Sequence, residues 1–170
     1  MSEAGFFCDC SAIAHFTFLR VINENSIVCL GNICRSPMAE FVLKDMMKKR
    51  GITGIEVCSR ATSNEEEGNP VYPPAKRELL KHGITSDGKY AEQLKKSDYD
   101  NADLFICMDE NNVRSAKRIF GGDSANKIVK LLSYLGSDGD IADPWYTGNF
   151  SLTYSQIENG CNALLKSIKN

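Results

Sequence analysis

The feature that most constrains the fold of this chain is the alternation of short apolar runs with longer helical patterns. Four runs rich in Ile, Val, Leu and Phe have the composition of strands buried on both faces of a sheet. We expect these strands at residues 26–30, 55–59, 103–108 and 127–132. Strands that alternate with helices form βα units around a parallel sheet. The pattern therefore predicts an α/β fold.

The expected helices begin and end at recognisable signals. Ser36 and Pro37 are typical of an N-cap followed by a proline at the first helical position, and the basic end of that run precedes a glycine. A second run shows the same design, and the last one carries apolar residues at helical spacing. The helices are expected over 38–50, 74–82, 110–120 and 152–168.

The amino-terminal segment fits this scheme least well. Asn23, Glu24 and Asn25 precede the first expected strand, where a buried parallel strand would normally carry apolar residues. The residues before them are moderately apolar, but charges interrupt them and they lack the positive cluster of a signal peptide. Either the first strand is short or the chain begins with an unusual extension. We therefore expect an atypical extension over 1–25 and a single domain over 26–170.

Composition narrows the class of protein. With 170 residues, 42% of them hydrophobic and 25% charged, the chain fits one compact domain. The net charge of −2 and the lack of a long Lys/Arg block argue against a nucleic-acid partner. No uninterrupted apolar run reaches the ~18 residues of a membrane span. The seven cysteines are odd in number and lack paired secretory spacing, which predicts reduced thiols in the cytoplasm.

The loop after the first expected strand carries the strongest chemical signal. Residues 29–37, CLGNICRSP, form a Cys-x5-Arg pattern that opens directly into a helix. The backbone N–H groups of such a loop and the helix dipole together bind a dianion. Arg35 adds a planar fork that can hold two phosphate oxygens. The same positive field favours thiolate over thiol at Cys29 and makes it a nucleophile.

The other loop residues suit the same purpose. Gly31 permits close backbone approach or positive φ, Asn32 tolerates left-handed geometry, and Ser36 is placed to hydrogen-bond the sulfur. A lone Cys-x5-Arg also occurs by chance, and a buried cysteine at a strand end is usually inert packing. The accompanying glycine, asparagine, serine and proline favour a phosphate loop. Its expected phosphate-binding and supporting residues are Leu30, Gly31, Asn32, Ile33, Cys34 and Ser36.

Cleavage of a phosphate ester also requires a proton for the leaving oxygen. Asp143 is the candidate acid, because residues 143–146, DPWY, combine a carboxyl group with a rigid proline and two aromatic residues. Trp145 and Tyr146 could line the site and bind an aromatic ring. Taken alone, Asp-Pro is merely a turn signal. Its meaning comes from the phosphate loop elsewhere in the chain.

Together these motifs resemble the low-molecular-weight protein tyrosine phosphatase family. Residues 28–40, VCLGNICRSPMAE, are close to the family signature, and 143–146 match its general-acid loop. Segments 59–63, 68–70 and 107–109 are similar in the same order. The resemblance implies a three-layer sandwich, in which helices flank a four-stranded parallel sheet. It also implies that no metal or other cofactor is needed, since the loop itself neutralises the phosphate.

The resemblance further implies the reaction and its residues. The chain would hydrolyse phosphotyrosine in proteins or peptides, and small aryl phosphates, through a cysteinyl-phosphate intermediate. Cys29 would be the nucleophile, Arg35 the clamp on the phosphate and transition state, and Asp143 the acid that later activates water.

Three further residues take supporting roles by resemblance. Ser59 and His82 align with the polar network that holds the loop, although His82 also fits a surface histidine at a helix end. Cys34 would trap an oxidised nucleophile in a reversible disulfide, although it could simply fill space.

The rim of the expected site departs from the family. Where an aromatic residue usually follows Ser-x-Ala-Thr-Ser, this chain has residues 64–67, NEEE. The change removes one stacking wall, and the carboxylates would repel acidic phosphopeptides. We therefore expect Glu65 at the substrate rim beside Trp145 and Tyr146, and a preference for basic flanking residues. The acidic run also fits an ordinary solvated loop.

Three other functions are compatible with parts of this pattern. A phosphoarginine phosphatase of the same fold tends to carry threonine where this chain has Ile33. An arsenate reductase of the same fold passes a disulfide to two further cysteines, and residues 75–103 contain none. A non-catalytic phosphate-binding module would lack the nucleophile, the arginine or the acid, and candidates for all three are present.

Overall fold

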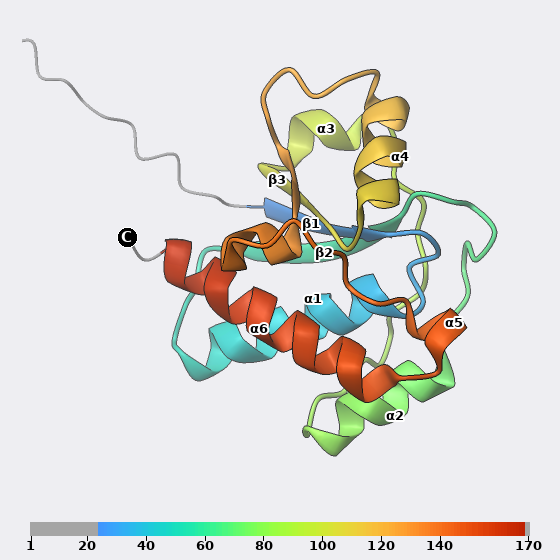
Figure 1. Cartoon of the computed structure of the whole chain (residues 1–170), viewed down its shortest axis with the longest axis vertical. Coiled ribbons are helices and arrows are strands. Elements are labelled where there is room, and N and C mark those ends of the chain that lie inside the picture. The colour runs from blue at the N-terminus through green and yellow to red at the C-terminus, as the bar shows by residue number, and fades with distance from the viewer. Residues whose placement is uncertain (1–23, 169–170) are drawn as a thin grey trace, which may run out of the picture.

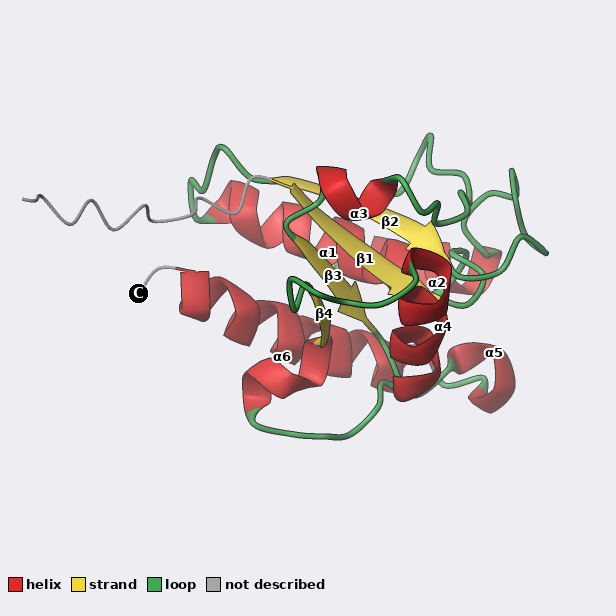
Figure 2. Cartoon of the chain, turned by 90° about the horizontal axis from the view of Figure 1, so that it is seen from above, coloured by secondary structure: helices red, strands yellow, loops and turns green. Residues whose placement is uncertain are grey.

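The computed structural model describes residues 24–168, which form a parallel β-sheet with helices on both faces (Figures 1 and 2). The sheet order is β2-β1-β3-β4, and every neighbouring pair is parallel. Its strands are β1 (Glu24–Cys29), β2 (Glu56–Ala61), β3 (Leu104–Cys107) and β4 (Ile128–Lys130). The expected three-layer α/β architecture with a four-stranded parallel sheet is confirmed.

Two groups of helices cover the two faces of the sheet. One group packs together below the sheet in Figure 1, and the other lies above it. The lower group contains α1 (Arg35–Lys49), α2 (Pro73–Lys81) and α6 (Phe150–Ile168). The upper group contains α3 (Asp98–Asn101) and α4 (Glu110–Phe120), while η1 (Leu131–Leu135) and α5 (Pro144–Thr147) lie in the connections before α6.

The alternation of side chains along each strand builds a core on each face. Ile27 and Ile106 pack into the cluster beneath α1 and α6, whereas Val28 and Phe105 pack into the cluster beneath α4. All four are at most 1% exposed. Burial on both faces explains why the strands read as continuous apolar runs.

The observed boundaries differ from the expected ones by one or two residues at all four strands, and the differences at β1 and β4 have a clear physical reason. β1 begins at Glu24, two residues early, and includes the buried Asn25. Because β1 pairs with strands on both sides, the ladder satisfies its backbone whatever the side chains are. The expected strand at 127–132 is wrong in its last two residues, where the chain turns into η1 and directs Leu131 toward α6.

The remaining expectations on chain organisation have different outcomes. The expected helix over 110–120 is confirmed to the residue, and the others are shifted by a few residues at their ends. Most of the expected extension over 1–25 lies outside the described residues, so its boundary with a 26–170 domain stays a prediction. Between Glu24 and Ile168, the structure contains no helix that is long and apolar enough to cross a membrane.

Gly160 sets how closely α6 approaches the end of the sheet. A Cβ atom at this buried position would lie 2.6 Å from Cγ of Leu131. Leu131 is itself 1% exposed and packs in the core, so it has little space to retreat. The absence of a side chain at Gly160 is therefore a packing requirement.

We expect Gly160→Ala to destabilise the protein, because overpacking typically costs about 1–3 kcal/mol and exceeds the ~1 kcal/mol helix-propensity gain of alanine. Urea denaturation measures the free energy of unfolding. The exposed neighbour Asn159 supplies the control, since Asn159→Ala should change stability by less than about 0.5 kcal/mol. Gly160→Ala should cost less in a Leu131→Ala background, and an equal cost in both backgrounds would contradict the proposed clash.

Candidate active site

The candidate site lies at the carboxyl edge of the sheet, where parallel folds commonly bind ligands. Cys29 is the last residue of β1, and residues 30–34 form a loop that leads into α1. The segment after β2 runs beside this loop, because Thr62 N–H donates to the Cys29 carbonyl and Ser63 N–H to the Leu30 carbonyl. The sheet thus places the loop and its supports at one edge.

The sulfur of Cys29 is buried and accepts hydrogen bonds. Asn32 N–H donates to Sγ over 3.3 Å, and Ser36 Oγ lies 3.0 Å from the same sulfur. Cys29 as a whole is 3% exposed. A sulfur with hydrogen-bond donors aimed at it is stabilised as an anion.

A chain of hydrogen bonds decides which way the Ser36 hydroxyl points. Asn32 Nδ2 donates to Ser36 Oγ and to Ser59 Oγ, each over 2.8 Å. Ser59 Oγ in turn donates to Glu40 Oε2 over 2.5 Å. Since the Ser36 oxygen already accepts from Asn32, its hydrogen is free to point at Cys29. The expected support roles of Asn32, Ser36 and Ser59 therefore have a matching geometry.

Glu40 is a member of this network that the sequence did not single out. It is 4% exposed and lies on α1, next to two cationic side chains. Lys44 Nζ is 2.5 Å from Glu40 Oε1, and Lys89 Nζ is 3.5 Å from Oε2. Lys89 also donates to the Ser59 carbonyl over 3.0 Å. These cations compensate the buried carboxylate at the far end of the chain of hydrogen bonds.

The residue with left-handed backbone conformation in the loop is Asn32 and not Gly31. Asn32 has φ of 56°, whereas Gly31 is absent from the positive-φ residues of the described chain. Gly31 is needed for close approach, because a Cβ atom there would lie 3.2 Å from Cγ of Glu66. Asn32 Oδ1 also accepts from Glu92 N–H over 3.1 Å, which holds the left-handed residue in place.

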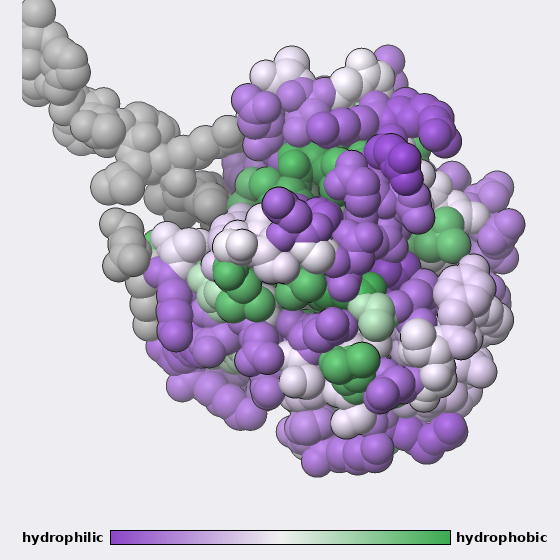
Figure 3. Space-filling model, viewed as in Figure 1, coloured by the Kyte–Doolittle hydropathy of each residue, from purple (hydrophilic) through white to green (hydrophobic). Residues whose placement is uncertain are grey.

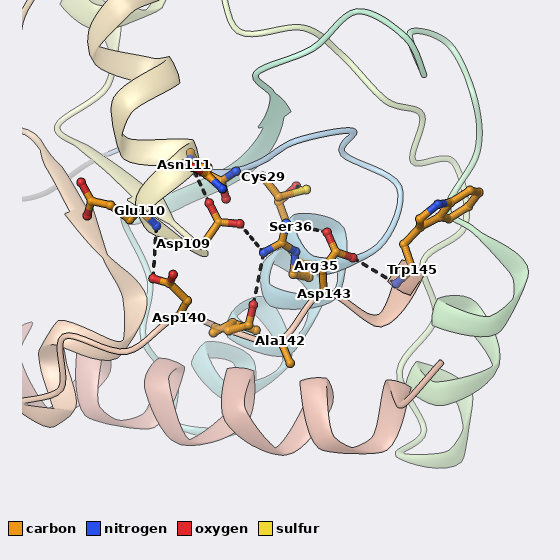
Figure 4. A network of polar contacts seen from close by, with 12 residues as sticks. Cys29, Arg35, Ser36, Asp109, Glu110, Asn111, Asp140, Ala142, Asp143 and Trp145 are labelled. Atoms are coloured by element: carbon orange, nitrogen blue, oxygen red, sulfur yellow. Dashed lines mark hydrogen bonds and ion pairs between the residues drawn. The ribbon is translucent and has the colours of Figure 1, made fainter. Parts of the chain in front are cut away.

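Arg35 lies between two carboxylates, as Figure 4 shows. Its Nη1 is 2.6 Å from Oδ2 of Asp109, and its Nη2 is 2.7 Å from Oδ2 of Asp143. Nη1 also donates to the Ile141 carbonyl over 3.2 Å. Burial by itself lowers the pKa of Arg35, but the negative charges of Cys29, Asp143 and Asp109 outweigh it and raise the pKa. The guanidinium is therefore a fixed positive charge beside Cys29.

Asp109 is the second residue that the sequence analysis left without a role. It lies two residues after the end of β3 and caps α4, since its Oδ1 accepts from Asn112 N–H over 2.7 Å. Its other oxygen holds Arg35. An acidic residue between a buried strand and a helix, at the sheet edge where ligands bind, was the available signal.

The candidate acid Asp143 reaches the same site from a distant part of the chain. Asp143 is the N-cap of α5, and its Oδ1 accepts from Trp145 N–H over 3.0 Å. Its Oδ2 contacts Arg35, so the carboxyl group faces the loop that contains Cys29. The structure thus brings the three candidate catalytic residues together.

The helix after the loop begins differently from the expectation. Ser36 is not the N-cap of α1; Cys34 occupies that position, and the helix begins at Arg35. The reason is that the Ser36 side chain is engaged with Cys29 and Asn32 inside the helix's first turn. Burial raises the pKa of the Cys34 thiol to about 12, and the nearby Cys29 adds to the increase.

A cavity of about 190 Å³, here called the phosphate pocket, opens above Cys29. The loop forms its floor, and acidic and aromatic side chains form its walls. The lining residues are Cys29, Leu30, Gly31, Asn32, Ile33, Cys34, Arg35, Glu65, Glu66, Asp143, Trp145 and Tyr146. Trp145 is held against Tyr72, with ring centroids 5.1 Å apart, whereas Tyr146 is 78% exposed. The expected rim residues therefore surround one opening.

His82 is the expected site residue that lies elsewhere. It follows α2, stacks on Tyr154 with ring centroids 3.7 Å apart, and its Nε2 is 3.6 Å from Oε1 of Glu78. It therefore takes the surface, helix-end position and does not join the network around Asn32. Among residues 24–168, no three His, Cys, Asp or Glu side chains gather closely enough to hold a metal ion.

We expect Asn32→Ala to lower the free energy of unfolding by about 2–4 kcal/mol, because it removes several buried hydrogen bonds and leaves a left-handed residue without its favourable side chain. Asn32→Gly should be about 1 kcal/mol more stable than Asn32→Ala, since glycine adopts positive φ without strain. Urea denaturation compares the two variants. Equal stability of the variants would mean that φ at this position carries no cost.

Comparison with known proteins supports the same interpretation. Residues 26–170 match the family model for low molecular weight phosphotyrosine protein phosphatases. The Bacillus subtilis protein named low molecular weight protein-tyrosine-phosphatase YfkJ is 41% identical over 145 residues, covering 84% of this chain and 93% of the relative. PtpA of Staphylococcus aureus, named likewise, is 36% identical over 84% of this chain and 92% of the relative.

Solved structures agree in fold as well as in sequence. The crystal structure of YfkJ from Bacillus subtilis superposes with a TM-score of 0.83 at 38% identity, covering 87% of this chain and 95% of that one. The low molecular weight protein tyrosine phosphatase of Streptococcus pyogenes gives a TM-score of 0.77 at 36% identity, covering 85% and 92%. The family model and the named relatives match nearly all of the described residues, including the Cys-x5-Arg loop and its buried arginine. The chain therefore belongs to the low molecular weight protein tyrosine phosphatase family of hydrolases.

Proposed function

We propose that this protein hydrolyses phosphotyrosine in proteins or peptides, and small aryl phosphates, through a phosphorylated Cys29. The observation that carries the proposal is the convergence on one sulfur of the Asn32 N–H, the Ser36 hydroxyl and the Arg35 charge. Such a field favours the thiolate, which is the reactive form of cysteine. The name of the family and of its members supports the choice of tyrosine phosphate.

In the first step, the Cys29 thiolate forms a bond to phosphorus while the bond from phosphorus to the tyrosine oxygen breaks. Asp143 donates its proton to that oxygen, and tyrosine leaves as a neutral phenol. Loop N–H groups and Arg35 hold the three remaining phosphate oxygens as charge shifts among them. Ser36 hydrogen-bonds the sulfur in both of its states.

In the second step, a water molecule attacks phosphorus and Asp143 takes up a proton from it. The sulfur–phosphorus bond breaks, the phosphate leaves, and Cys29 returns as a thiolate that Ser36 stabilises as a leaving group. Protons and bonds balance across the two steps, since Asp143 regains the proton that it gave to tyrosine.

The ion pair between Arg35 and Asp143 suits the exchange of partners that this scheme requires. A phosphate that accepts from Nη2 of Arg35 competes with Oδ2 of Asp143 for the same donor. The phosphate's own charge then favours the protonated form of the neighbouring carboxyl. Asp109 keeps its contact with Nη1, so the guanidinium stays oriented while Asp143 is released.

We expect Cys29→Ser to abolish hydrolysis, because a serine hydroxyl in this loop is not ionised at neutral pH. Asp143→Asn should lower kcat by about 10²–10⁴ on phosphotyrosine peptides. Its effect should be smaller on p-nitrophenyl phosphate, whose leaving group needs less proton transfer. Steady-state kinetics in the presence of a chelator measure the turnover of both substrates by the wild type and the two variants. In a separate assay without chelator, vanadate should inhibit the wild type competitively.

Exposed Asp140, which lies near Asp143 in sequence but does not line the phosphate pocket, supplies the matched control. Asp140→Asn should retain kcat within about twofold, in keeping with a surface substitution. Turnover that survives in Cys29→Ser would overturn the covalent scheme. An equal loss on both leaving groups in Asp143→Asn would overturn the role of Asp143 as the acid.

The acidic rim is proposed to select against acidic residues next to the phosphotyrosine. Glu65 and Glu66 both line the phosphate pocket. Carboxylates at this position repel an approaching acidic peptide, and salt at ~0.1 M screens that repulsion at separations beyond about 10 Å.

We expect Glu65→Gln combined with Glu66→Gln to raise kcat/KM for acidic phosphopeptides by about three- to tenfold at low salt, as removal of one exposed and one half-buried charge would. Glu67→Gln is the matched control, because Glu67 belongs to the same run but accepts from Gln93 N–H away from the pocket. If the double variant and the control behave alike, the carboxylates have no part in selection.

The remaining proposals concern the alternative substrate phosphoarginine, the cellular compartment and the protein partners. Ile33, which lines the phosphate pocket, favours a phenol ring over the polar guanidine of phosphoarginine. We place the protein in the cytoplasm, because a reactive thiolate requires reducing surroundings and the five cysteines in the described chain are all free. Tyrosine-phosphorylated proteins are its proposed partners.

A further inference from the structure

A second cavity, here called the α4 basin, adjoins the phosphate pocket on the side of α4. It has a volume of about 650 Å³ and lies under the hydrophilic surface that Figure 3 shows over α4. Leu30, Arg35, Asp143 and Tyr146 line both cavities, so they form the ridge between them. A group that extends from a substrate in the phosphate pocket can therefore reach the α4 basin by crossing this ridge.

The charges of the α4 basin are opposite to those of the acidic rim. Three arginines line it, namely Arg35, Arg114 and Arg118, and its acidic residues are Asp109 and Asp143. Both aspartates are already paired with Arg35. Arg35 offsets only one of these two negative charges, and the two guanidinium groups on α4 bring the formal charge of the lining to +1, so the basin is positive.

The two arginines of α4 are available for a ligand. Arg114 and Arg118 are exposed and four residues apart, which places them on one face of the helix. Arg114 donates to the amide oxygen of Asn111, a neutral partner. Within residues 24–168, neither arginine is paired with a carboxylate. A carboxylate that enters the basin would meet two unpaired, always charged donors.

We propose that the α4 basin binds an acidic side chain, Asp or Glu, that flanks the phosphotyrosine of a substrate. The inference rests on the proposed function and extends it to substrate selection. Because Glu65 and Glu66 line the phosphate pocket but not the α4 basin, the acidic and the basic surface contact different parts of a bound peptide, and the enzyme distinguishes the two directions along it. It prefers a substrate with an acidic residue toward α4 and a basic residue toward Glu65.

The test uses two phosphopeptides of identical composition and net charge. One carries two glutamates before the phosphotyrosine and two lysines after it, and the other has the reverse order. Overall attraction or repulsion is equal for both, so a difference in kcat/KM reports only the side on which each charge lies. We expect one order to be preferred by at least about fivefold at low salt and the preference to shrink in ~0.5 M salt.

Arg114→Gln and Arg118→Gln should each reduce the preference for one order by about two- to fivefold, as expected for an exposed charge pair. Lys117→Gln is the matched control, because it removes one positive charge from an exposed position of α4 that does not line the basin. The quantity compared is kcat/KM of each peptide divided by that of p-nitrophenyl phosphate, which cancels any change in the phosphate pocket itself.

Three outcomes would count against the α4 basin. Equal turnover of the two orders would overturn the inference, as would an order preference that both arginine variants retain or that Lys117→Gln reduces equally. These results are distinct from failure of the proposed function, which would appear as no hydrolysis of p-nitrophenyl phosphate by the wild type. Circular dichroism of each variant verifies that α4 remains folded.

Discussion

The buried chain of hydrogen bonds from Glu40 to Cys29 is the interaction on which the rest of the site depends. A carboxylate at one end orients Ser59, which leaves Asn32 to donate toward Ser36 and the Ser36 hydrogen to face the sulfur. Every member is satisfied, which is the condition under which a buried polar network specifies one geometry. The network ends with the Asn32 N–H and the Ser36 hydroxyl next to the sulfur of Cys29.

Charge is distributed around this loop in layers. Arg35 is the buried positive centre, and Asp109 and Asp143 balance it from opposite sides of its planar fork. Both carboxylates cap a helix, but Asp109 caps α4, which has 11 residues, whereas Asp143 caps α5, which has only 4. Farther out, the surface is acidic at Glu65 and basic at Arg114. The inner layer suits catalysis, and the outer layer suits selection among substrates.

Much of this arrangement could be predicted from the sequence, because local patterns carry it. The helix over 110–120 ends before Gly121, which the sequence indicates, and is capped at its start by Asp109, which the sequence analysis did not single out. The residues of the loop from Cys29 to Ser36 are contiguous in the sequence, so their pattern can be recognised without the structure. The errors arose where tertiary contacts override local preference. Ser36 contacts the sulfur of Cys29 and is not the N-cap, and β4 ends before Leu131, which packs against Gly160.

His82 and Glu40 show the limit most clearly. His82, which the sequence analysis assigned to the network, stacks on Tyr154 instead. Glu40 on α1, which the sequence analysis did not single out, completes the network. Spacing along the sequence does not reveal which way a helix face turns. The sequence by itself determined the parallel α/β class and the Cys-x5-Arg loop with its arginine, because these depend on residues adjacent in the chain. The tertiary structure decided that Asp109 and Asp143 meet on one guanidinium and that rims of opposite charge flank one pocket. Those facts depend on segments brought together by packing of the sheet, and no local pattern encodes their distances.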